Sequence, residues 1–417
     1  MDFYFPDSQD QISPHFNFES EEHPPYRIRQ QDDWYAHQAL GGPAYTGILV
    51  SRAMVDGTGE SSGRYSLPQR HQMYREGVRK FYRLDGYPGI RLRTMGDCGA
   101  FTYAKEEVPP VRVTDVINFY EECQFDAGVS VDHVILGYDA SDELALPGVD
   151  VIPADWKRRR EISLELASEF LKEHASQKCG FEPIGAVQGW SPASYAASAT
   201  ELQKMGYKRL GLGGMVSLKS KDILAVLKRV NEVRKADVEV HIFGVTRTQH
   251  VNEFAEYGVT SIDSTSPFRQ AFKDDKDNYH TAKGNFVAIR VPQVDANPKL
   301  KKAILAGKVD QRKAQVLESK CLHAVRAYDA GKRSLNDVLD VLEEYEVLYA
   351  GKSKHREAYR TTLEAAPWKE CTCQICKEHG VEVILFRGSE RNKRRGFHNL
   401  HVFHEKLTKI TAKKKRK

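Results

Sequence analysis

Short apolar runs rich in β-branched residues alternate with longer amphipathic stretches between residues 44 and 267. Near-continuous apolar runs of this length are typical of parallel strands that are buried on both faces, and the longer stretches have the periodicity of helices. The pattern predicts strands in seven runs, at 46–55, 89–97, 131–139, 183–189, 207–214, 238–245 and 259–267. It predicts the main intervening helices at 155–175, 191–206, 219–235 and 248–258.

A strand, a helix and a parallel strand are joined by a right-handed crossover, so repetition of this unit gives an open doubly wound sheet or a closed barrel. Seven strands, with one more still unrecognised, favour the eight-stranded TIM-type (β/α)8 barrel, an α/β fold. The alternation of apolar runs and amphipathic stretches ends after Pro267. Residues 268–301 look irregular and basic, and residues 302–363 have the pattern of helices.

Composition and charge narrow the function only slightly. Hydrophobic residues make up 41% and charged residues 29% of the 417 residues, as in an ordinary globular protein. No apolar run is long enough for a membrane span, and the acidic start lacks the basic and apolar regions of a signal peptide. The net charge of +5 does not by itself indicate a nucleic-acid partner. However, RNKRR at 391–395 and the lysine-rich end are a candidate phosphate-contacting surface.

The seven cysteines are an odd number, and three of them lie within residues 371–376. This spacing argues against a disulfide framework and for metal binding in a reducing cytoplasm. Three thiolates joined by an imidazole from a following helix form a closed tetrahedral zinc site, which is structural because no position stays open. The predicted ligands are Cys371, Cys373, Cys376 and His398, with His401 as the alternative to His398.

These observations predict four regions. Residues 1–43 form an N-terminal extension, and residues 44–300 form the catalytic barrel. Residues 301–405 form a helical, zinc-binding region, and residues 406–417 form a basic tail.

Polar residues end several of the predicted strands, where barrel enzymes carry their catalytic groups. These residues are Asp97, Asp139, Gln188 and Asp263. A single aspartate in such a place is more often a turn former or helix cap than a catalytic group. Four strands that deliver polar groups to one rim predict a single shared site.

The motifs around these residues form an ordered set: GDCGAF, GYDAS, AVQGW, LGLGG and IDSTSPFR, followed by the cysteine string that ends in HNLHV. Together they resemble the motifs of tRNA-guanine transglycosylases over residues 44–405. The resemblance implies a pentosyltransferase that exchanges one purine-type base of a nucleic acid for another.

The resemblance also implies a role for each matched position. Asp263 matches the family's nucleophile, and Asp97 matches its general acid/base. The matched base-binding positions are Phe101, Asp139, Gln188, Gly213, Gly214 and Phe243. This chain has Cys98 where the family usually has serine, and a thiol is a weaker hydrogen-bond partner. The residues that follow Asp263 also differ from the usual pattern.

The chemistry explains why two carboxyl groups are needed. Base exchange breaks an N-glycosidic bond through an oxocarbenium-like transition state, which a carboxylate such as Asp263 can trap as a covalent glycosyl-enzyme. A second carboxyl, Asp97, would protonate the departing guanine and then deprotonate the incoming base. Two bases that use one site in turn give a ping-pong cycle.

The N-terminal strings PDSQD and DDWYAH resemble the bacterial and phage branch of this family, which inserts 7-deazaguanines into DNA. The branch implies 7-cyano-7-deazaguanine (preQ0) as the incoming base. It implies a DNA-modification or restriction system, with a companion ATPase as a further partner. A duplex substrate requires the target guanine to be flipped out of the stack.

Three alternatives remain at this point. The first is a tRNA-guanine transglycosylase of the queuosine or archaeosine pathway, although the C-terminus shows no recognisable RNA-binding module. The second is a non-catalytic partner subunit, which would be expected to have lost Asp97 or Asp263. The third is an unrelated barrel hydrolase, which the ordered motifs disfavour.

Overall fold

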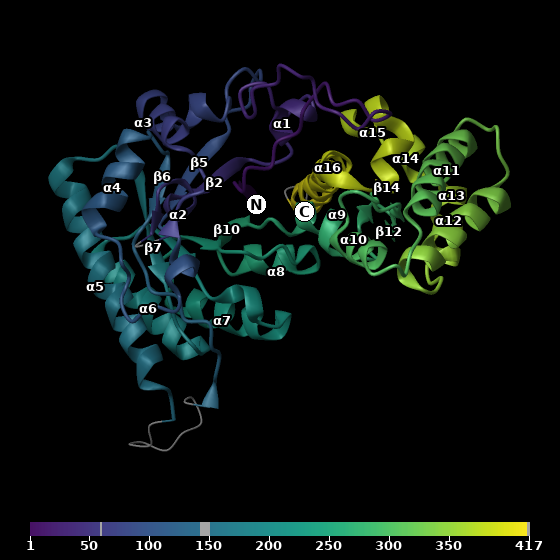
Figure 1. Ribbon diagram of the computed structural model, residues 1–417. Helices are drawn as coiled ribbons and strands as arrows, with labels where there is room; N and C mark the ends of the chain where they lie inside the picture. The colour runs from purple at the N-terminus through teal and green to yellow at the C-terminus, as the bar shows by residue number, and fades with distance from the viewer. Residues whose placement is uncertain (59–60, 142–150, 415–417) are drawn as a thin grey trace. The chain divides into compact units, whose positions relative to one another are not determined.

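The computed structural model describes residues 1–58, 61–141 and 151–414 (Figure 1). The chain forms two compact units. Unit 1 comprises residues 1–9, residues 45–265 and the described residues from 407 onward, and unit 2 comprises residues 10–44 and 266–406. This division differs from the expected ranges, because the first nine residues group with the barrel and the barrel unit ends at Thr265 instead of residue 300.

Unit 1 contains a closed barrel of eight strands, each parallel to its neighbours. This arrangement confirms the predicted TIM-type (β/α)8 fold. The strands follow the order β1-β10-β9-β8-β7-β6-β5-β2 around the barrel. Their bounds are β1 Asp2–Pro6, β2 Gly47–Ser51, β5 Arg93–Asp97, β6 Ala127–Val129, β7 Glu182–Val187, β8 Arg209–Leu212, β9 Glu239–Ile242 and β10 Val259–Asp263. All eight carboxyl ends therefore meet at one rim.

The strand that the sequence did not reveal is β1, with the sequence DFYFP. It closes the barrel by pairing with β10 on one side and β2 on the other, so that Tyr4 lies opposite both Asp263 and Gly47. A side chain at Gly47 would clash, because its Cβ would lie 2.6 Å from the Tyr4 ring. Residues 2–6 are therefore part of the barrel and do not belong to an N-terminal extension.

Strand β6 ends earlier than the apolar pattern predicts. The expected strand at 131–139 is a buried loop that begins after Val129. The loop is fixed by bonds to the next strand and the segment after it: the Ile135 amide donates to Gln188 Oε1 at 3.1 Å, and the Asp139 amide donates to the Trp190 carbonyl at 2.8 Å. The side chains from Val131 to Ile135 are buried without a strand ladder, which is why the run resembled a strand.

Helices surround the barrel strands of unit 1 in Figure 1. The predicted helices are present as α5 Ala154–Gln177, α6 Pro192–Met205, α7 Ser220–Val233 and α8 Val251–Glu256, and the unit also contains α2 Arg52–Val55, α3 Leu67–Phe81, α4 Val113–Glu122 and a short hairpin of β3 Gly57–Thr58 and β4 Ser61–Ser62. Helix α6 shows how local sequence sets such ends. Ser191 caps its first turn by accepting from the Ser194 amide at 3.3 Å, and Gly206 ends it with φ 117°.

Unit 2 is mainly helical. Its elements are α1 Ala36–Ala39, α9 Ser266–Lys273, β11 Tyr279–His280, β12 Asn285–Phe286, β13 Ile289–Arg290, α10 Pro298–Leu305, α11 Gln311–Asp329, α12 Leu335–Ala350, α13 Arg356–Ala365, α14 Pro367–Glu370, α15 Gln374–His379, β14 Leu385–Phe386 and the first part of α16 Gly388–Lys414. Helix α12 packs against both α11 and α13. Among the described residues, no helix has the length and apolar character needed to cross a bilayer.

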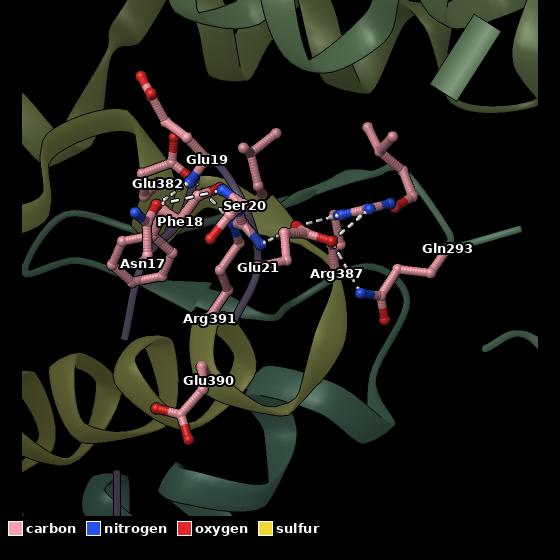
Figure 2. A network of polar contacts seen from close by, with 12 residues as sticks. Asn17, Phe18, Glu19, Ser20, Glu21, Gln293, Glu382, Arg387, Glu390 and Arg391 are labelled. Carbon is pink, nitrogen blue, oxygen red and sulfur yellow. Dashed lines mark hydrogen bonds and ion pairs between the residues drawn. The ribbon is translucent and has the colours of Figure 1, made fainter. Parts of the chain in front are cut away.

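Residues 10–44 belong to unit 2 because a buried ion-pair network holds them there (Figure 2). The Glu21 carboxylate lies between Arg387 and Arg391, and it also accepts from Gln293 Nε2 at 2.8 Å. Arg391 continues the network by pairing with Glu382 at 2.7 Å. Burying these charges costs desolvation free energy, and the several ion pairs of the network offset that cost.

The same network corrects the prediction that RNKRR contacts phosphates. Arg391, Arg394 and Arg395 are each at most 2% exposed. Arg394 pairs with Glu390 at 2.6 Å, and Arg395 donates to the Ala271 and Leu385 carbonyls. These arginines therefore make buried contacts within unit 2 and do not form an exposed basic surface. The predicted basic tail, residues 406–417, continues α16 as far as residue 414, and residues 415–417 lie outside the described residues.

Candidate active site

Two carboxyl groups end strands of the barrel, as predicted. Asp97 is the last residue of β5, and Asp263 is the last residue of β10. Burial, followed by the negative charges of Asp132 and Asp263, raises the pKa of Asp97 to about 7. Hydrogen bonds from Ser51 and Gly99 oppose this shift only partly. A carboxyl with this pKa can both give and take a proton near neutral pH, which is what a general acid/base requires.

Asp263 is only 6% exposed, and one of its carboxylate oxygens is held firmly. Oδ1 accepts from the Gly244 amide at 3.0 Å and lies 3.1 Å from Nε2 of His241. Gly244 supplies this amide from a backbone with φ 73°, a conformation that favours glycine. Oriented hydrogen bonds of this kind fix the carboxylate relative to the barrel rim.

Asp132 is a third carboxyl group at this site, and the sequence analysis did not select it. Its Oδ2 accepts from Gln188 Nε2 at 2.6 Å, and its Oδ1 accepts from the Cys98 thiol at 3.3 Å. Burial is the main cause that raises its pKa to about 6. The signal in the sequence was a charged residue inside the apolar run SVDHVIL. Such a residue is seldom buried unless it has partners or a function.

Asp139, the residue predicted to read the base, does not join this cluster. Its side chain is half-buried, and its carboxylate accepts from the Ser141 amide at 2.8 Å, which lowers its pKa. The physical reason is the early end of β6. Because the strand stops at Val129, its carboxyl end delivers Asp132 to the rim, seven positions before Asp139.

Gln188, Gly213 and Gly214 lie close together, and the two glycines leave space for the Gln188 side chain and the loop beside it. Gln188 uses both ends of its amide, since Oε1 accepts from the Ile135 amide at 3.1 Å while Nε2 donates to Asp132. A Cβ at Gly213 would lie 2.1 Å from Gln188 Nε2. A Cβ at Gly214, where φ is 73°, would lie 2.5 Å from the Ile135 carbonyl oxygen. Only glycine at these positions leaves room for the Gln188 side chain and the adjacent loop.

The two predicted aromatic residues differ in exposure. Phe101 lies in a short 3-10 turn, Ala100–Tyr103, directly after β5, and it is 56% exposed. Phe243 follows β9 and packs on the barrel core, with its ring 4.5 Å from that of His241. An exposed ring beside a strand end is free to stack on a planar ligand, which is the role predicted for Phe101.

Unit 2 contains the predicted metal-binding cluster. The donor atoms of Cys371, Cys373, Cys376 and His398 all lie within 4.8 Å of one another. His398 Nδ1 is 3.3, 3.5 and 3.3 Å from the three sulfur atoms in that order. For a tetrahedral zinc ion, bond lengths of about 2.3 Å to sulfur and about 2.0 Å to nitrogen place these atoms about 3.5 Å apart. The residues therefore fit such an ion.

Neighbouring groups orient these donors. His398 Nε2 lies 2.8 Å from the His280 carbonyl, so this nitrogen donates and Nδ1 keeps its lone pair for a metal. The Tyr279 ring stacks on the imidazole at 4.1 Å, and its hydroxyl lies 3.2 Å from Cys376 Sγ. His401, the alternative ligand, instead pairs with Glu405 at 3.4 Å. His398 lies within α16, which begins ten positions before it.

Comparison with known proteins gave two findings. The family model described as queuine tRNA-ribosyltransferase matches residues 149–413, a range that contains Asp263 and the cysteine cluster. A protein of Salmonella montevideo named DNA-guanine transglycosylase is 45% identical over 411 residues, which cover 98% of this chain and 96% of that protein. This second match extends over Asp97, Asp132 and almost the whole N-terminal region.

Proposed function

Because this chain belongs to the queuine tRNA-ribosyltransferase family of guanine transglycosylases, we propose that it replaces guanine in DNA with the 7-deazaguanine base preQ0. The main support for this reaction is the pair of carboxyl groups at the ends of β5 and β10. Burial and neighbouring negative charges raise the pKa of Asp97 to about 7, and hydrogen bonds fix one carboxylate oxygen of Asp263. The enzyme is a glycosyltransferase that works by a ping-pong exchange.

In the first half-reaction, a carboxylate oxygen of Asp263 attacks C1′ of the target nucleotide. The bond between C1′ and the base nitrogen breaks, and the proton of Asp97 passes to the departing guanine. The product is a sugar ester of Asp263. In the second half-reaction, the ring nitrogen of the incoming base attacks C1′, its proton passes to the Asp97 carboxylate, and Asp263 leaves as a carboxylate. Two displacements at one carbon retain its configuration.

Base recognition falls to the buried cluster beside Asp97. Asp132 accepts hydrogen bonds from the amidine edge that guanine and preQ0 share, and Gln188 holds its carboxylate in place at 2.6 Å. Phe101 stacks on one face of the base, and Phe243 borders the other. Gly213 and Gly214 let the backbone approach the base closely. In this proposal Asp132 takes the role that the sequence had suggested for Asp139.

DNA is favoured as the polymer by the relative named DNA-guanine transglycosylase, since the similarity runs through the N-terminal region as well as the barrel. The target guanine must leave the base stack to reach carboxyl groups at a barrel rim. The family description favours tRNA as the second candidate substrate. A non-catalytic role fits poorly, because Asp97 and Asp263 are both present and placed at strand ends.

We further propose that the ion held by the three cysteines and His398 is zinc, because soft thiolates and an imidazole in a tetrahedral arrangement are its typical ligands. When bound, the ion stabilises unit 2 and takes no part in the base exchange. None of the seven cysteines forms a disulfide, which fits a reducing cytoplasm.

The test is nucleoside mass spectrometry of plasmid DNA and of tRNA, from cells that make preQ0 and carry the gene with its native neighbours, including any companion ATPase. The comparison strain carries Asp263→Asn in place of the wild type. A deazaguanine in DNA that depends on Asp263 supports the proposal. A deazaguanine in tRNA alone would transfer the same chemistry to the second candidate. Modification that persists with Asp263→Asn would overturn the proposed mechanism.

A further inference from the structure

A line of polar side chains crosses the buried interior of the barrel. Arg209 Nη1 contacts the Glu182 carboxylate at 3.1 Å, and Arg209 Nη2 donates to Ser261 Oγ at 3.0 Å. Ser261 Oγ lies 2.9 Å from Nδ1 of His241, whose Nε2 lies 3.1 Å from Asp263 Oδ1. Arg209 is 2% exposed, and Ser261 and His241 are fully buried. The line therefore links the start of β7 to the carboxylate at the end of β10.

The donors along this line fix the position of the histidine proton. Arginine can only donate, so Ser261 Oγ accepts from Arg209 and has its own hydroxyl proton to give to Nδ1 of His241. Nδ1 is then an acceptor, and the ring carries its proton on Nε2, where it donates to Asp263. Burial, the leading cause, lowers the pKa of His241. The hydrogen bond and charge of Asp263 oppose this shift without reversing it, and the charge of Arg209 adds to the lowering. The ring is therefore neutral at physiological pH.

The consequence concerns the two oxygens of Asp263. Oδ1 has two hydrogen-bond partners, the Gly244 amide and His241, which engage both of its in-plane lone pairs. Among the residues that the structure describes, none donates to Oδ2. We propose that His241 is a positioning residue that makes Oδ2 the attacking oxygen and holds it on its line of attack. This inference rests on the proposed role of Asp263 as the nucleophile.

The same hydrogen bond also acts in the second half-reaction. Once Oδ2 is bonded to the sugar, Oδ1 becomes the carbonyl oxygen of the ester. When the ester breaks, negative charge returns to the carboxylate, and the Nε2–H of His241 is already in place to stabilise it. A buried histidine that merely filled space between the Tyr4 and Phe243 rings would not need this proton placement.

The kinetic test compares two substitutions. His241→Leu keeps an apolar side chain in the core but removes the donor, whereas His241→Gln keeps an amide N–H that reaches Asp263. We expect the single-turnover rate of base exchange to fall about 100-fold with His241→Leu, with KM for DNA nearly unchanged, because a misdirected nucleophile affects the chemical step. His241→Gln should recover most of this rate. The control is His174→Leu. His174 lies on α5 and contacts the Phe181 carbonyl instead of Asp263, so this substitution should leave the rate unchanged.

Equal losses for the glutamine and leucine variants, or a loss confined to KM, would contradict the positioning role. A second measurement does not depend on activity or on the folding of a variant. Nitrogen-15 NMR of labelled histidine in the wild-type protein should show His241 as the neutral Nε2–H form at neutral pH. The Nδ1–H form, or a charged ring, would overturn the inference. Absence of base exchange in the wild type, with the Nε2–H form present, would count against the proposed function alone.

Discussion

Arg391 lies 370 positions after Glu21 in the sequence, and its Nη1 donates to the Glu21 carboxylate at 2.5 Å. Burial by itself would raise the pKa of Glu21, but hydrogen bonds and charges from Arg387 and then Arg391 lower it to about 2. This pair fastens the N-terminal segment of unit 2 to the helix that carries the metal ligand His398. Residues 10–44 are thus tied to a distant part of the chain by buried ion pairs.

Glu21→Gln should therefore destabilise unit 2 by about 3 kcal/mol, because two buried arginines each lose one of their two carboxylate partners. Urea unfolding would measure the loss, and hydrogen exchange of residues 10–32 would show where the segment loosens. Glu22→Gln is the matched control, since the neighbouring glutamate is exposed. Equal stability of the two variants would mean that the network contributes little.

Asp97→Asn should stop base exchange and stabilise the protein at high pH. Folding raises the pKa of Asp97 from 3.8 to about 7, so the folded protein binds this proton more tightly than the unfolded chain does. The free energy of unfolding of the wild type therefore falls as the pH rises from about 4 to 7. The Asp97→Asn side chain does not ionise, so the free energy of unfolding of this variant does not fall for this reason. Urea unfolding should show a gain on the order of 2–4 kcal/mol at pH 8, shrinking toward pH 4. A gain independent of pH would argue against the raised pKa.

Asp132→Asn should lower kcat/KM for base exchange by about 100-fold or more, because an amide presents donors where the base edge needs an acceptor. Asp139→Asn should leave kcat/KM roughly unchanged, since that carboxylate bonds to Ser141 outside the cluster. Incorporation of labelled guanine into DNA measures both. The reverse order of effects would restore the assignment made from the sequence.

Cys373→Ala should release the metal and destabilise unit 2, because three remaining donors cannot complete a closed tetrahedral site. Elemental analysis should find about one zinc per wild-type chain and almost none in the variant. Cys179→Ala removes a thiol outside the cluster and should retain the metal. A metal-free Cys373→Ala protein with the stability of the wild type would refute the structural role.

Asp263→Ala and Asp263→Asn should lower turnover by a factor of about 10⁴ or more, as expected for loss of a nucleophile. Neither variant should form the covalent sugar ester that rapid denaturation of the wild type would trap. The melting temperature should change little, since the residue lies at the end of its strand. Turnover that survives in either variant would assign the nucleophile elsewhere.

The sequence predicted six strands of the barrel and the main helices between them, because those segments carry the local signals of buried strands and amphipathic helices. Strand β6 was placed too late, in the loop that follows Val129. The remaining strand, DFYFP, is five residues long, and its identity depends on pairing with β10, which follows more than 250 residues later. Nothing within such a short segment distinguishes a barrel strand from an extended arm.

The candidate site was partly predictable for a related reason. Asp97 and Asp263 directly end strands whose limits are clear, so their placement at the rim followed from the pattern. Asp132 was not selected from the sequence, because an apolar run hid the end of β6 and the pattern pointed to Asp139 as the residue at the strand end. The arginines of RNKRR looked like a surface cluster, since their partner Glu21 lies in a distant segment. Burial of charge is a tertiary property that composition does not reveal.

The pairing of β1 with β10 has a consequence for how the protein is made. During translation, the first strand can meet β2 soon after both leave the ribosome, but its other neighbour is not synthesised until residue 263. At ~5–20 residues per second, this interval is on the order of 10–50 s. Throughout that time the nascent chain presents open strand edges, which are sites of mispairing with other chains. Residues 2–6, which are made long before β10, are thus among the last to be fixed in the fold.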